Sequence, residues 1–285
     1  MKKIRIAVQK SGRLHDDSLN LLKDAGISID NGKEQLKATS RNFPLEIFYL
    51  RNGDIPQYLR DGVVDIAIIG ENVLIEKGED IITAEKLGFS KCRVSLAVPK
   101  SMQYSGLKDL DGKKIATSYP NTVNSFLSKN GISAELHIIN GSVEIAPNIG
   151  LADAICDIVS SGSTLFKNNL KEVEVMLKSE AVLAVSPMID EERNEILQKL
   201  QFRIKSVLRA RNSKYILMNI PNDKVEEVIE LLPGMRSPTV LPLAEEGWSS
   251  IHTVIEEERF WEVIDELKRN GAEGILVTSI EKMVL

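Results

Sequence analysis

Short β-rich runs alternate with helical stretches from Ile4 to about Val185, and this alternation constrains the fold more than any other feature. Strand candidates such as Leu45–Leu50 and Ala154–Val159 are short and apolar, and helix candidates such as Asp16–Ala25 and Thr122–Asn130 end at a glycine, as helices often do. This pattern predicts α/β lobes built on largely parallel sheets. Further strands are expected at Ile4–Val8, Asp65–Ile69, Arg93–Val98, Lys114–Ser118, Glu135–Ile139, Glu172–Leu177 and Val182–Val185, and a further helix at Pro56–Asp61.

The chain has 285 residues, which is too many for one compact core because domains usually hold ~100 to 200 residues. The Pro99–Gly112 stretch is rich in Ser, Gly and Asp and predicts the joint between a first and a second lobe. A long amphipathic helix is expected at Ile189–Leu208, where apolar residues recur at helical spacing.

The last 75 or so residues change to the order strand, helix, strand, strand, helix, strand, which is the order of a ferredoxin-like unit. A module of this kind after an α/β body often senses a small ligand, although fold alone does not establish that role. The expected elements are Tyr215–Ile220, Val225–Leu232, Thr239–Pro242, Ser249–Ile255, Phe260–Asn270 and Gly274–Ile280.

Composition and charge exclude several classes of function. The formal net charge of −5 gives no global positive field for a nucleic-acid backbone, so no nucleic-acid partner is expected. Cys92 and Cys156 lie far apart in apolar stretches, which predicts two reduced core thiols rather than a disulfide or a zinc cluster. The first residues lack the apolar core of a signal peptide, and no run approaches the ~20 apolar residues of a membrane span, which predicts a cytoplasmic protein.

The Ala152–Leu165 segment, ADAICDIVSSGSTL, carries the most chemical information. An apolar strand runs into a turn in which Gly162 permits unusual backbone angles, and Asp157 near the strand end can accept hydrogen bonds from ribose hydroxyls. Hydroxyls and backbone N–H groups in such a turn suit a bound phosphate, and an ordinary strand-to-helix loop with a capping serine is the alternative. The turn matches neither a Walker motif nor a dinucleotide-binding glycine motif. Its hydroxyl residues are Ser160, Ser161, Ser163 and Thr164.

Other polar residues also follow predicted strands. Lys10 and Arg13 lie in a glycine-containing loop after the first strand, which suits a phosphate-bearing ligand, while exposed loop cations are also common as solvated surface charges. Glu144 has a second interpretation as the cap of a short helix near Ile145–Ile149. The remaining strand-end positions are Arg51, Glu71 and Tyr119.

In combination these motifs resemble the ATP phosphoribosyltransferase family, which begins histidine biosynthesis. The resemblance is carried, in order, by VQKSGRL, YLRNGDIP, DIAIIGEN, IATSYPN, NGSVEIAP and LADAICDIVSSGSTL. The tail motifs SKYILMNIP, LLPGMRSPTVLPL and GILVTSIEKM resemble the long form of the family, so the likeness covers essentially the whole chain.

The resemblance implies a catalytic body of two lobes of the type II periplasmic-binding-protein-like kind, with the active site between them, and a ferredoxin-like regulatory domain. The first lobe would comprise residues 1–98 and 181–210, the second residues 99–180, and the regulatory domain residues 211–285. Dimers that assemble into hexamers are expected.

The resemblance also implies transfer of the 5-phosphoribosyl group from phosphoribosyl pyrophosphate to N1 of ATP, with Mg²⁺ as cofactor and histidine as feedback inhibitor. The metal ligands are unknown. The implied catalytic residues are Lys10, Glu144 and Asp157. The implied substrate-binding residues are Arg13, Arg51, Glu71, Tyr119, Asp153, Ser160, Ser161, Gly162, Ser163 and Thr164. The implied histidine-binding residues are Asn219, Ser237, Thr239, Val254 and Gly274.

Two other functions remain open at this stage. A two-lobed protein that grips small anions without catalysis is the main alternative, and the missing export and DNA-binding segments weigh against it. A phosphoribosyltransferase that acts on another acceptor, such as nicotinate or a pyrimidine base, is the second. Some family members carry an acid at the position of Asn219, which leaves its contact with the effector's amino group open.

Overall fold

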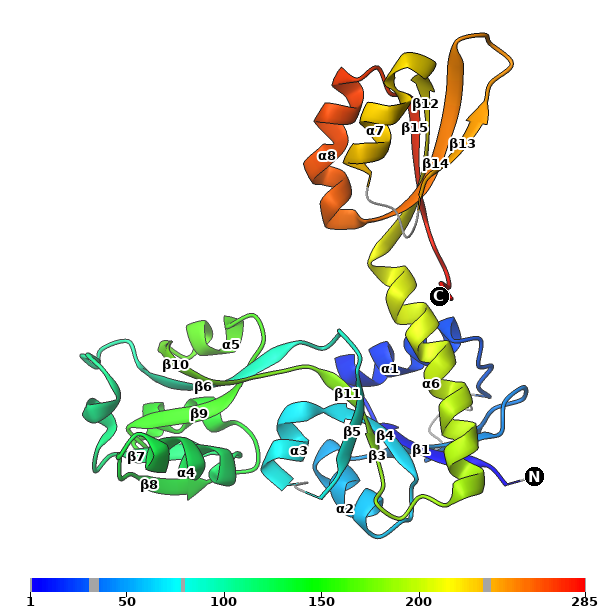
Figure 1. Ribbon diagram of the computed structural model, residues 1–285. Helices are drawn as coiled ribbons and strands as arrows, with labels where there is room; N and C mark the ends of the chain where they lie inside the picture. The colour runs from blue at the N-terminus through cyan, green and yellow to red at the C-terminus, as the bar shows by residue number, and fades with distance from the viewer. Residues whose placement is uncertain (1, 31–35, 78–79, 233–236, 285) are drawn as a thin grey trace. The chain divides into compact units, whose positions relative to one another are not determined.

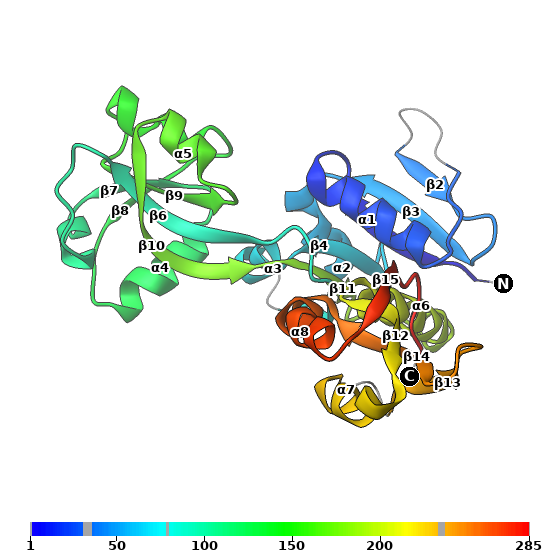
Figure 2. The same ribbon diagram turned by 90° about the horizontal axis from the view of Figure 1, so that it is seen from above.

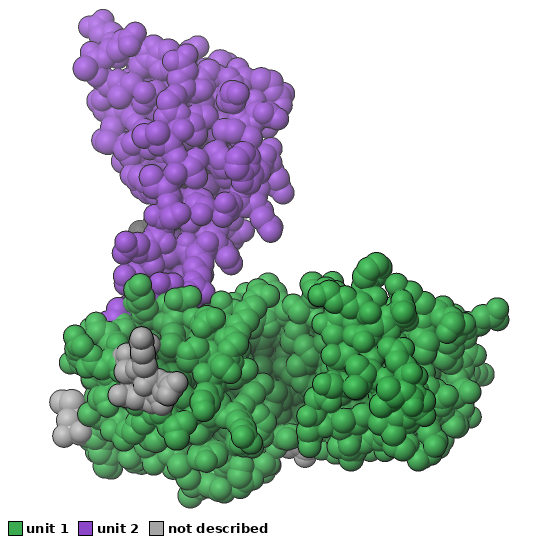
Figure 3. Space-filling model, turned by 180° about the vertical axis from the view of Figure 1, so that it is seen from behind, with its two compact units in different colours: residues 1–23, 27–198 green, residues 24–26, 199–285 purple. Residues whose placement is uncertain are grey.

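The computed structural model describes residues 2–30, 36–77, 80–232 and 237–284, and the chain divides into two compact units (Figures 1 and 3). Unit 1 comprises Met1–Lys23 and Ile27–Gln198, and unit 2 comprises Asp24–Gly26 and Lys199–Leu285. The strands are β1 (Ile4–Gln9), β2 (Lys37–Thr39), β3 (Leu45–Leu50), β4 (Ile66–Gly70), β5 (Ile82–Lys86), β6 (Cys92–Pro99), β7 (Lys114–Thr117), β8 (Glu135–Ile138), β9 (Ala154–Val159), β10 (Leu170–Ser179), β11 (Ala181–Val185), β12 (Ser213–Pro221), β13 (Thr239–Pro242), β14 (Trp248–Glu256) and β15 (Glu273–Ser279). The helices are α1 (Arg13–Asp24), α2 (Ile55–Arg60), α3 (Glu71–Lys77), α4 (Pro120–Lys129), α5 (Ser163–Lys167), α6 (Glu191–Arg211), α7 (Val225–Leu231) and α8 (Glu257–Arg269).

The first sheet of unit 1 has six strands in the order β2-β3-β1-β4-β11-β5. Its central strands β3, β1 and β4 are parallel, and the apolar residues of β1 and β4 are buried. Strands buried on both faces explain why the sequence shows continuous apolar runs here rather than alternation. The carboxyl ends of these three strands therefore share one edge of the sheet.

The second sheet of unit 1 has five strands in the order β10-β6-β9-β7-β8. Its strands β9, β7 and β8 are parallel, and α4 packs Val123 and Leu127 into the core of this lobe. Both sheets thus contain the predicted parallel centre.

Several flanking strands are antiparallel, which the sequence did not predict. β6 pairs antiparallel with β9 and β10, and β11 pairs antiparallel with β4. These strands lie where the chain crosses between the two sheets, as Figure 2 shows for β6 and β10. An apolar run has the same periodicity in either direction, so only the topology could reveal the reversal.

The predicted boundary between residues 98 and 99 is wrong for β6. This strand belongs to the second sheet, so the chain crosses before Cys92. The polar Pro99–Gly112 stretch is a connection within the second lobe, from β6 to β7, rather than a joint between lobes. The return expected at Ala181 coincides with the start of β11. The strands β2 and β5 were not predicted, because β2 has three residues and β5 is largely exposed.

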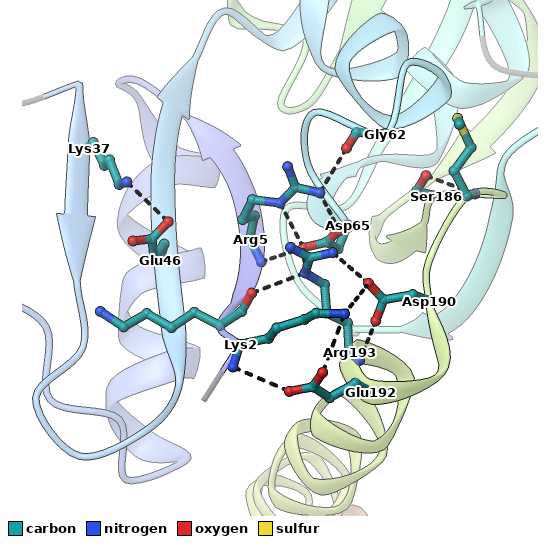
Figure 4. A network of polar contacts seen from close by, with 12 residues as sticks. Lys2, Arg5, Lys37, Glu46, Gly62, Asp65, Ser186, Asp190, Glu192 and Arg193 are labelled. Atoms are coloured by element: carbon teal, nitrogen blue, oxygen red, sulfur yellow. Dashed lines mark hydrogen bonds and ion pairs between the residues drawn. The ribbon is translucent and has the colours of Figure 1, made fainter.

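A buried ion network fixes the start of α6 in unit 1 (Figure 4). The Asp65 carboxylate is nearly inaccessible and pairs with Arg5 at 2.7 Å and with Arg193 at 3.3 Å. Arg193 also donates to Asp190 at 2.7 Å, and Arg5 donates to the Gly62 carbonyl at 2.8 Å. A buried carboxylate is tolerated when it is paired and hydrogen-bonded in this way.

Unit 2 contains the four-stranded antiparallel sheet β13-β14-β12-β15. The helices α7 and α8 cover one face of it, and their apolar side chains form its core with those of β12 and β14 (Figure 1). The element order and the strand order confirm the predicted ferredoxin-like fold. Residues 233–236 of the LLPGMRSPTVLPL motif lie outside the described residues.

Candidate functional site

Three of the predicted loops meet at the carboxyl edge of the first sheet. Lys10 follows β1 and its backbone N–H donates to the Leu50 carbonyl of β3 at 2.8 Å, so Lys10 lies beside Arg51. Glu71 follows β4, the other neighbour of β1. The strand order β3-β1-β4 therefore brings the exposed Lys10 and Arg51 and the half-buried Glu71 to neighbouring positions at this edge.

The charges at this edge differ in how they are held. Lys10, Arg13 and Arg51 are exposed, and Arg13 has an ion pair with Asp17 at 3.7 Å. The Glu71 carboxylate instead pairs with Lys86 at 3.1 Å. Exposed cations of this kind are available to an anionic ligand at little cost in desolvation.

The polar loops after the parallel strands β8 and β9 meet at one small cavity of the second lobe. The cavity has a volume of about 160 Å³ and brings Glu144 and Asp157 together with the whole predicted phosphate loop. The loop members that line it are Ser160, Ser161, Gly162, Ser163 and Thr164.

The Ser160–Thr164 turn leaves its polar groups available. Gly162 has a φ of +79°, which is the left-handed region that side chains disfavour, and this conformation turns the chain from β9 into α5. The Ser161 hydroxyl donates to the Ser163 hydroxyl at 3.1 Å, and all four hydroxyl residues of the turn are exposed. The turn can therefore offer several donors to an oxyanion without being rebuilt.

Asp157 is the most perturbed carboxyl group of this cavity. Burial raises the pKa of Asp157, the hydrogen bond from the Ile158 N–H at 2.8 Å opposes that shift, and the charge of Glu144 adds to it. The two carboxylates therefore line one cavity and influence each other's charge. A carboxyl group with a raised pKa in a cavity is a candidate functional group.

Two predicted substrate-binding residues lie elsewhere. Tyr119 is buried, and its hydroxyl accepts a hydrogen bond from Asn72 at 2.9 Å, so it does not face the small cavity. Asp153 precedes β9 and accepts from the Lys114 N–H at 2.9 Å, at the opposite end of the strand from the turn. Their assignment as substrate ligands remains a prediction.

A second, larger cavity of about 430 Å³ lies beside the first and is shared by the two lobes of unit 1. Glu71 and Lys86 come from the first sheet, and Arg93 and Ser160 from the second, so residues of both sheets line one space. Figure 3 shows unit 1 hollowed between its two halves. The other charged residues that line this cavity are Lys91, Lys178 and Glu180.

Sequence reasoning missed two polar groups close to the site. Arg93 at the start of β6 donates to the Ser160 carbonyl at 3.0 Å. Glu76 of α3 is buried, and its carboxylate accepts from the Asn121 and Thr122 N–H groups at 2.9 Å each. The sequence shows Arg93 and Glu76 only as charged residues within elements that are otherwise largely apolar. That signal does not identify the groups that they bind.

Four of the predicted histidine-binding positions form one surface of unit 2. Met218 and Ile220 face the helices, so Asn219 between them faces the uncovered side of the sheet. Val254 and Thr239 have the same orientation, because they pair with residues of that face on the neighbouring strands. Gly274 lies against Asn219, since a Cβ there would be 3.5 Å from the Asn219 Nδ2 atom. Ser237 is exposed just before β13.

Two carboxylates of the small cavity fit a hard divalent cation that keeps water and substrate oxygens as its other ligands. Asp157 and Glu144 are oxygen donors at one cavity, and Mg²⁺ usually takes one or two carboxylates together with water and substrate oxygens. Over the described ranges, no group of three or more His, Cys, Asp or Glu side chains is arranged to hold a metal ion. Cys92 and Cys156 are free thiols; Cys156 is buried in the core as predicted, whereas Cys92 is only half-buried.

The fold and the two cavities define a two-lobed α/β protein with a hydroxyl-rich turn at a cavity and an appended ferredoxin-like domain. The family model described as "HisG: ATP phosphoribosyltransferase" matches residues 51–206, and "HisG, C-terminal domain" matches residues 210–282. The chain belongs to the ATP phosphoribosyltransferase family, in its long form, and is a transferase of histidine biosynthesis.

Curated relatives and solved structures agree with this assignment. The chain is 56% identical to the ATP phosphoribosyltransferase of Phocaeicola vulgatus over 99% of this chain and 100% of the relative. It is 54% identical to that of Cytophaga hutchinsonii over 99% of this chain and 98% of the relative. A structure described as the ATP phosphoribosyl transferase (HisG:HisZ) complex from Thermotoga maritima matches 71% of this chain and 98% of that chain, with 30% identity and a TM-score of 0.60.

A more distant structural likeness concerns the fold alone. The structure of Tv2483 bound to L-arginine matches 73% of this chain and 85% of that chain with 12% identity and a TM-score of 0.51. The two-lobed α/β architecture predicted for the catalytic body is confirmed by the two sheets of unit 1, and this likeness concerns that architecture only. None of the described helices combines the length and apolar character that a membrane crossing requires.

Proposed function

We propose that the chain transfers the 5-phosphoribosyl group of phosphoribosyl pyrophosphate to N1 of ATP and releases pyrophosphate, as the first step of histidine biosynthesis in the cytoplasm. One observation carries the proposal: the cavity in which Asp157 and Glu144 meet the hydroxyl-rich turn at Ser160–Thr164. Family membership supports the reaction class, and this cavity is the place that we propose for the sugar phosphate.

The donor's 5-phosphate binds the turn in this proposal. Exposed hydroxyls and the backbone N–H groups around Gly162 replace the water around the phosphate oxygens. Asp157 lies near the end of β9, just before the turn, and accepts hydrogen bonds from the ribose hydroxyls. This arrangement holds the ribose C1 atom at a fixed distance from the anchored phosphate, which reduces the entropic cost of the reaction.

The transfer itself requires little acid–base chemistry. Adenine N1 already carries a lone pair at neutral pH, so it attacks C1 of the ribose without a general base. Positive charge develops on the ribose ring as the bond to pyrophosphate breaks, and the carboxylates of Asp157 and Glu144 stabilise that charge.

Departure of pyrophosphate requires neutralisation of its negative charge. Lys10, Arg13 and Arg51 are exposed cations beside the carboxyl edge of the first sheet and are the residues proposed to bind it. Mg²⁺, when bound, would supply further positive charge to the pyrophosphate oxygens, with Asp157 and Glu144 as its protein ligands.

We further propose that unit 2 binds histidine and inhibits the reaction. The uncovered face of its sheet groups Asn219 with Thr239 and Val254, and the glycine at 274 leaves room beside Asn219. Amide and hydroxyl groups on this sheet face suit a small zwitterion. The Thermotoga maritima relative was solved as a complex of two kinds of chain, and for this chain we propose a homo-oligomer, from dimer to hexamer.

Pyrophosphate release tests the reaction directly. The protein is incubated with ATP, phosphoribosyl pyrophosphate and Mg²⁺, and pyrophosphate is expected only when both substrates are present. Replacement of ATP by nicotinate or by a pyrimidine base tests the acceptor, and release with either instead of ATP contradicts the proposal. A protein that binds both substrates without release is a binding protein. Addition of histidine is expected to slow release in the full chain and not in a soluble variant that ends at Arg211.

A further inference from the structure

One guanidinium group contacts the backbone of the phosphate turn from outside its cavity. Arg93 lies on β6, which pairs with β9, and it is in register with Val159 at the end of that strand. Its Nη1 atom donates to the carbonyl oxygen of Ser160, the first residue of the turn, at 3.0 Å. Ser160 lines both cavities of unit 1, whereas Arg93 lines only the larger one.

The other edge of the same guanidinium is fixed by Glu172 of β10. Arg93 Nε donates to one carboxylate oxygen of Glu172 at 2.5 Å, and Nη2 donates to the other at 2.6 Å. The buried Ser95 hydroxyl donates to the same carboxylate at 2.7 Å. A two-point contact of this kind sets the plane of the guanidinium, and it leaves Nη1 directed at Ser160.

The contact with the Ser160 carbonyl determines which way the following peptide faces. A trans peptide is planar, so its C=O and N–H groups point in opposite directions. While Arg93 holds the Ser160 carbonyl on its own side, the Ser161 N–H points the opposite way. A flipped peptide would exchange a donor for an acceptor in the turn, and a carbonyl oxygen repels phosphate.

We propose that Arg93 is a positioning residue that keeps the Ser160–Thr164 turn in its phosphate-binding conformation. The charge of Arg93 is already balanced by Glu172, and the arginine lowers the pKa of that carboxyl. The ion pair therefore orients the turn, and Arg93 is not a free cation for a substrate. The inference rests on the proposed function of the turn as the donor's phosphate site. It adds a residue from a neighbouring strand whose effect is transmitted only through the backbone.

The test compares Arg93→Lys, Glu172→Gln and a matched control, Arg259→Lys. Lysine keeps the positive charge but cannot contact Glu172 and Ser160 in fixed directions at the same time. Arg259 pairs with Glu262 at 2.7 Å on the exposed side of α8 in unit 2, so its replacement reports the general effect of the exchange. KM for each substrate, kcat and Tm are measured for the full chain.

Arg93→Lys is expected to raise KM for phosphoribosyl pyrophosphate about 10- to 100-fold, the scale of one lost charge-assisted hydrogen bond. KM for ATP should stay within about 2-fold, and Glu172→Gln should shift the donor KM in the same direction by less, because one carboxylate oxygen survives as an amide oxygen. Equal changes in both KM values, or a loss of kcat in proportion to a fall in Tm, would show a merely structural role and overturn the proposal.

A binding measurement separates this inference from the proposed reaction. Calorimetry with ribose 5-phosphate reports the turn without turnover, and Arg93→Lys should weaken that binding while Arg259→Lys leaves it unchanged. If the wild-type chain binds ribose 5-phosphate and releases no pyrophosphate, the proposed reaction fails and the role of Arg93 stands. Equal affinity in Arg93→Lys and the wild type would exclude the positioning role.

Discussion

Two strand-to-helix turns follow neighbouring parallel strands of the second sheet, and they differ in whether a side chain of the protein binds their N–H groups. The turn after β7 leads into α4, and its Asn121 and Thr122 N–H groups both bind the carboxylate of Glu76, which also accepts from the Thr122 hydroxyl at 2.7 Å. The turn after β9 leads into α5, and Gly162 at its N-terminal position makes no side-chain capping bond. One turn therefore has a carboxylate of the protein bound to it, and the other has exposed donors.

The difference shows how one local structure serves two purposes. A strand-to-helix turn presents N–H donors wherever it occurs, and an anion of either protein or ligand can bind them. Glu76 is buried and comes from α3, so the filled turn fastens the two lobes of unit 1 to each other. Asn72 extends this joint, because its side-chain amide donates to the Tyr119 hydroxyl at 2.9 Å and its backbone N–H donates to the Ser179 hydroxyl at 3.0 Å.

The largest expected effect is at the open turn, from Asp157→Asn. The exchange removes a negative charge from the cavity in which positive charge develops on the ribose, and kcat should fall by about 10²- to 10³-fold, the scale of one lost electrostatic contact in a transition state. Steady-state pyrophosphate release measures the loss. Unchanged kcat would exclude Asp157 from the site.

The same variant should gain stability, which serves as its control. Burial raises the pKa of Asp157, so the folded chain binds this proton more tightly than the unfolded chain does. The unfavourable charge is therefore present above the folded pKa and is relieved as pH falls through it, and stability declines with rising pH between the unfolded and folded pKa values. At pH 7, denaturant unfolding should give Asp157→Asn a larger free energy of unfolding than the wild type. The difference between the two should be smaller at acid pH.

The second effect is at the filled turn, from Glu76→Ala. Two N–H groups and one hydroxyl lose a charged acceptor inside the protein, and the free energy of unfolding should fall by about 2 to 4 kcal/mol. Glu76→Gln keeps one acceptor oxygen and should lose less. Urea unfolding measures both values, and a loss below about 0.5 kcal/mol for the alanine variant would contradict the role of this carboxylate as a joint.

The smallest effect on stability is expected from Gly162→Ala, for which Gly88→Ala is a matched control. Both glycines have positive φ angles, +79° and +74°, with open space at the Cβ position, so each exchange should cost about 1 to 2 kcal/mol of unfolding free energy. Only Gly162→Ala should raise KM for phosphoribosyl pyrophosphate, because only that glycine lies in the phosphate turn. Equal KM values in the two variants would count against the turn as the donor site.

Local pattern was sufficient to predict most of the strands and helices. Buried strands gave continuous apolar runs, and glycine after a helix marked its end, so the strands from β1 to β15 were expected near their observed bounds except for β2 and β5. The Asp157–Thr164 segment could be singled out because its residues are consecutive in the chain. The meeting of several loops could also be expected, since the carboxyl ends of parallel strands share an edge.

The amino-acid sequence by itself determined the α/β alternation, the ferredoxin-like order of the last elements and the run of hydroxyl residues around Gly162 after β9. Only the tertiary structure decided that β6 joins the second sheet, that Glu76 binds the N–H group of Asn121, 45 residues away in the chain, and that Arg93 contacts Ser160 while Glu172 orients its guanidinium. The physical reason is that periodicity records whether a side chain is buried, whereas the identity of its partner depends on packing between segments that are distant in the chain.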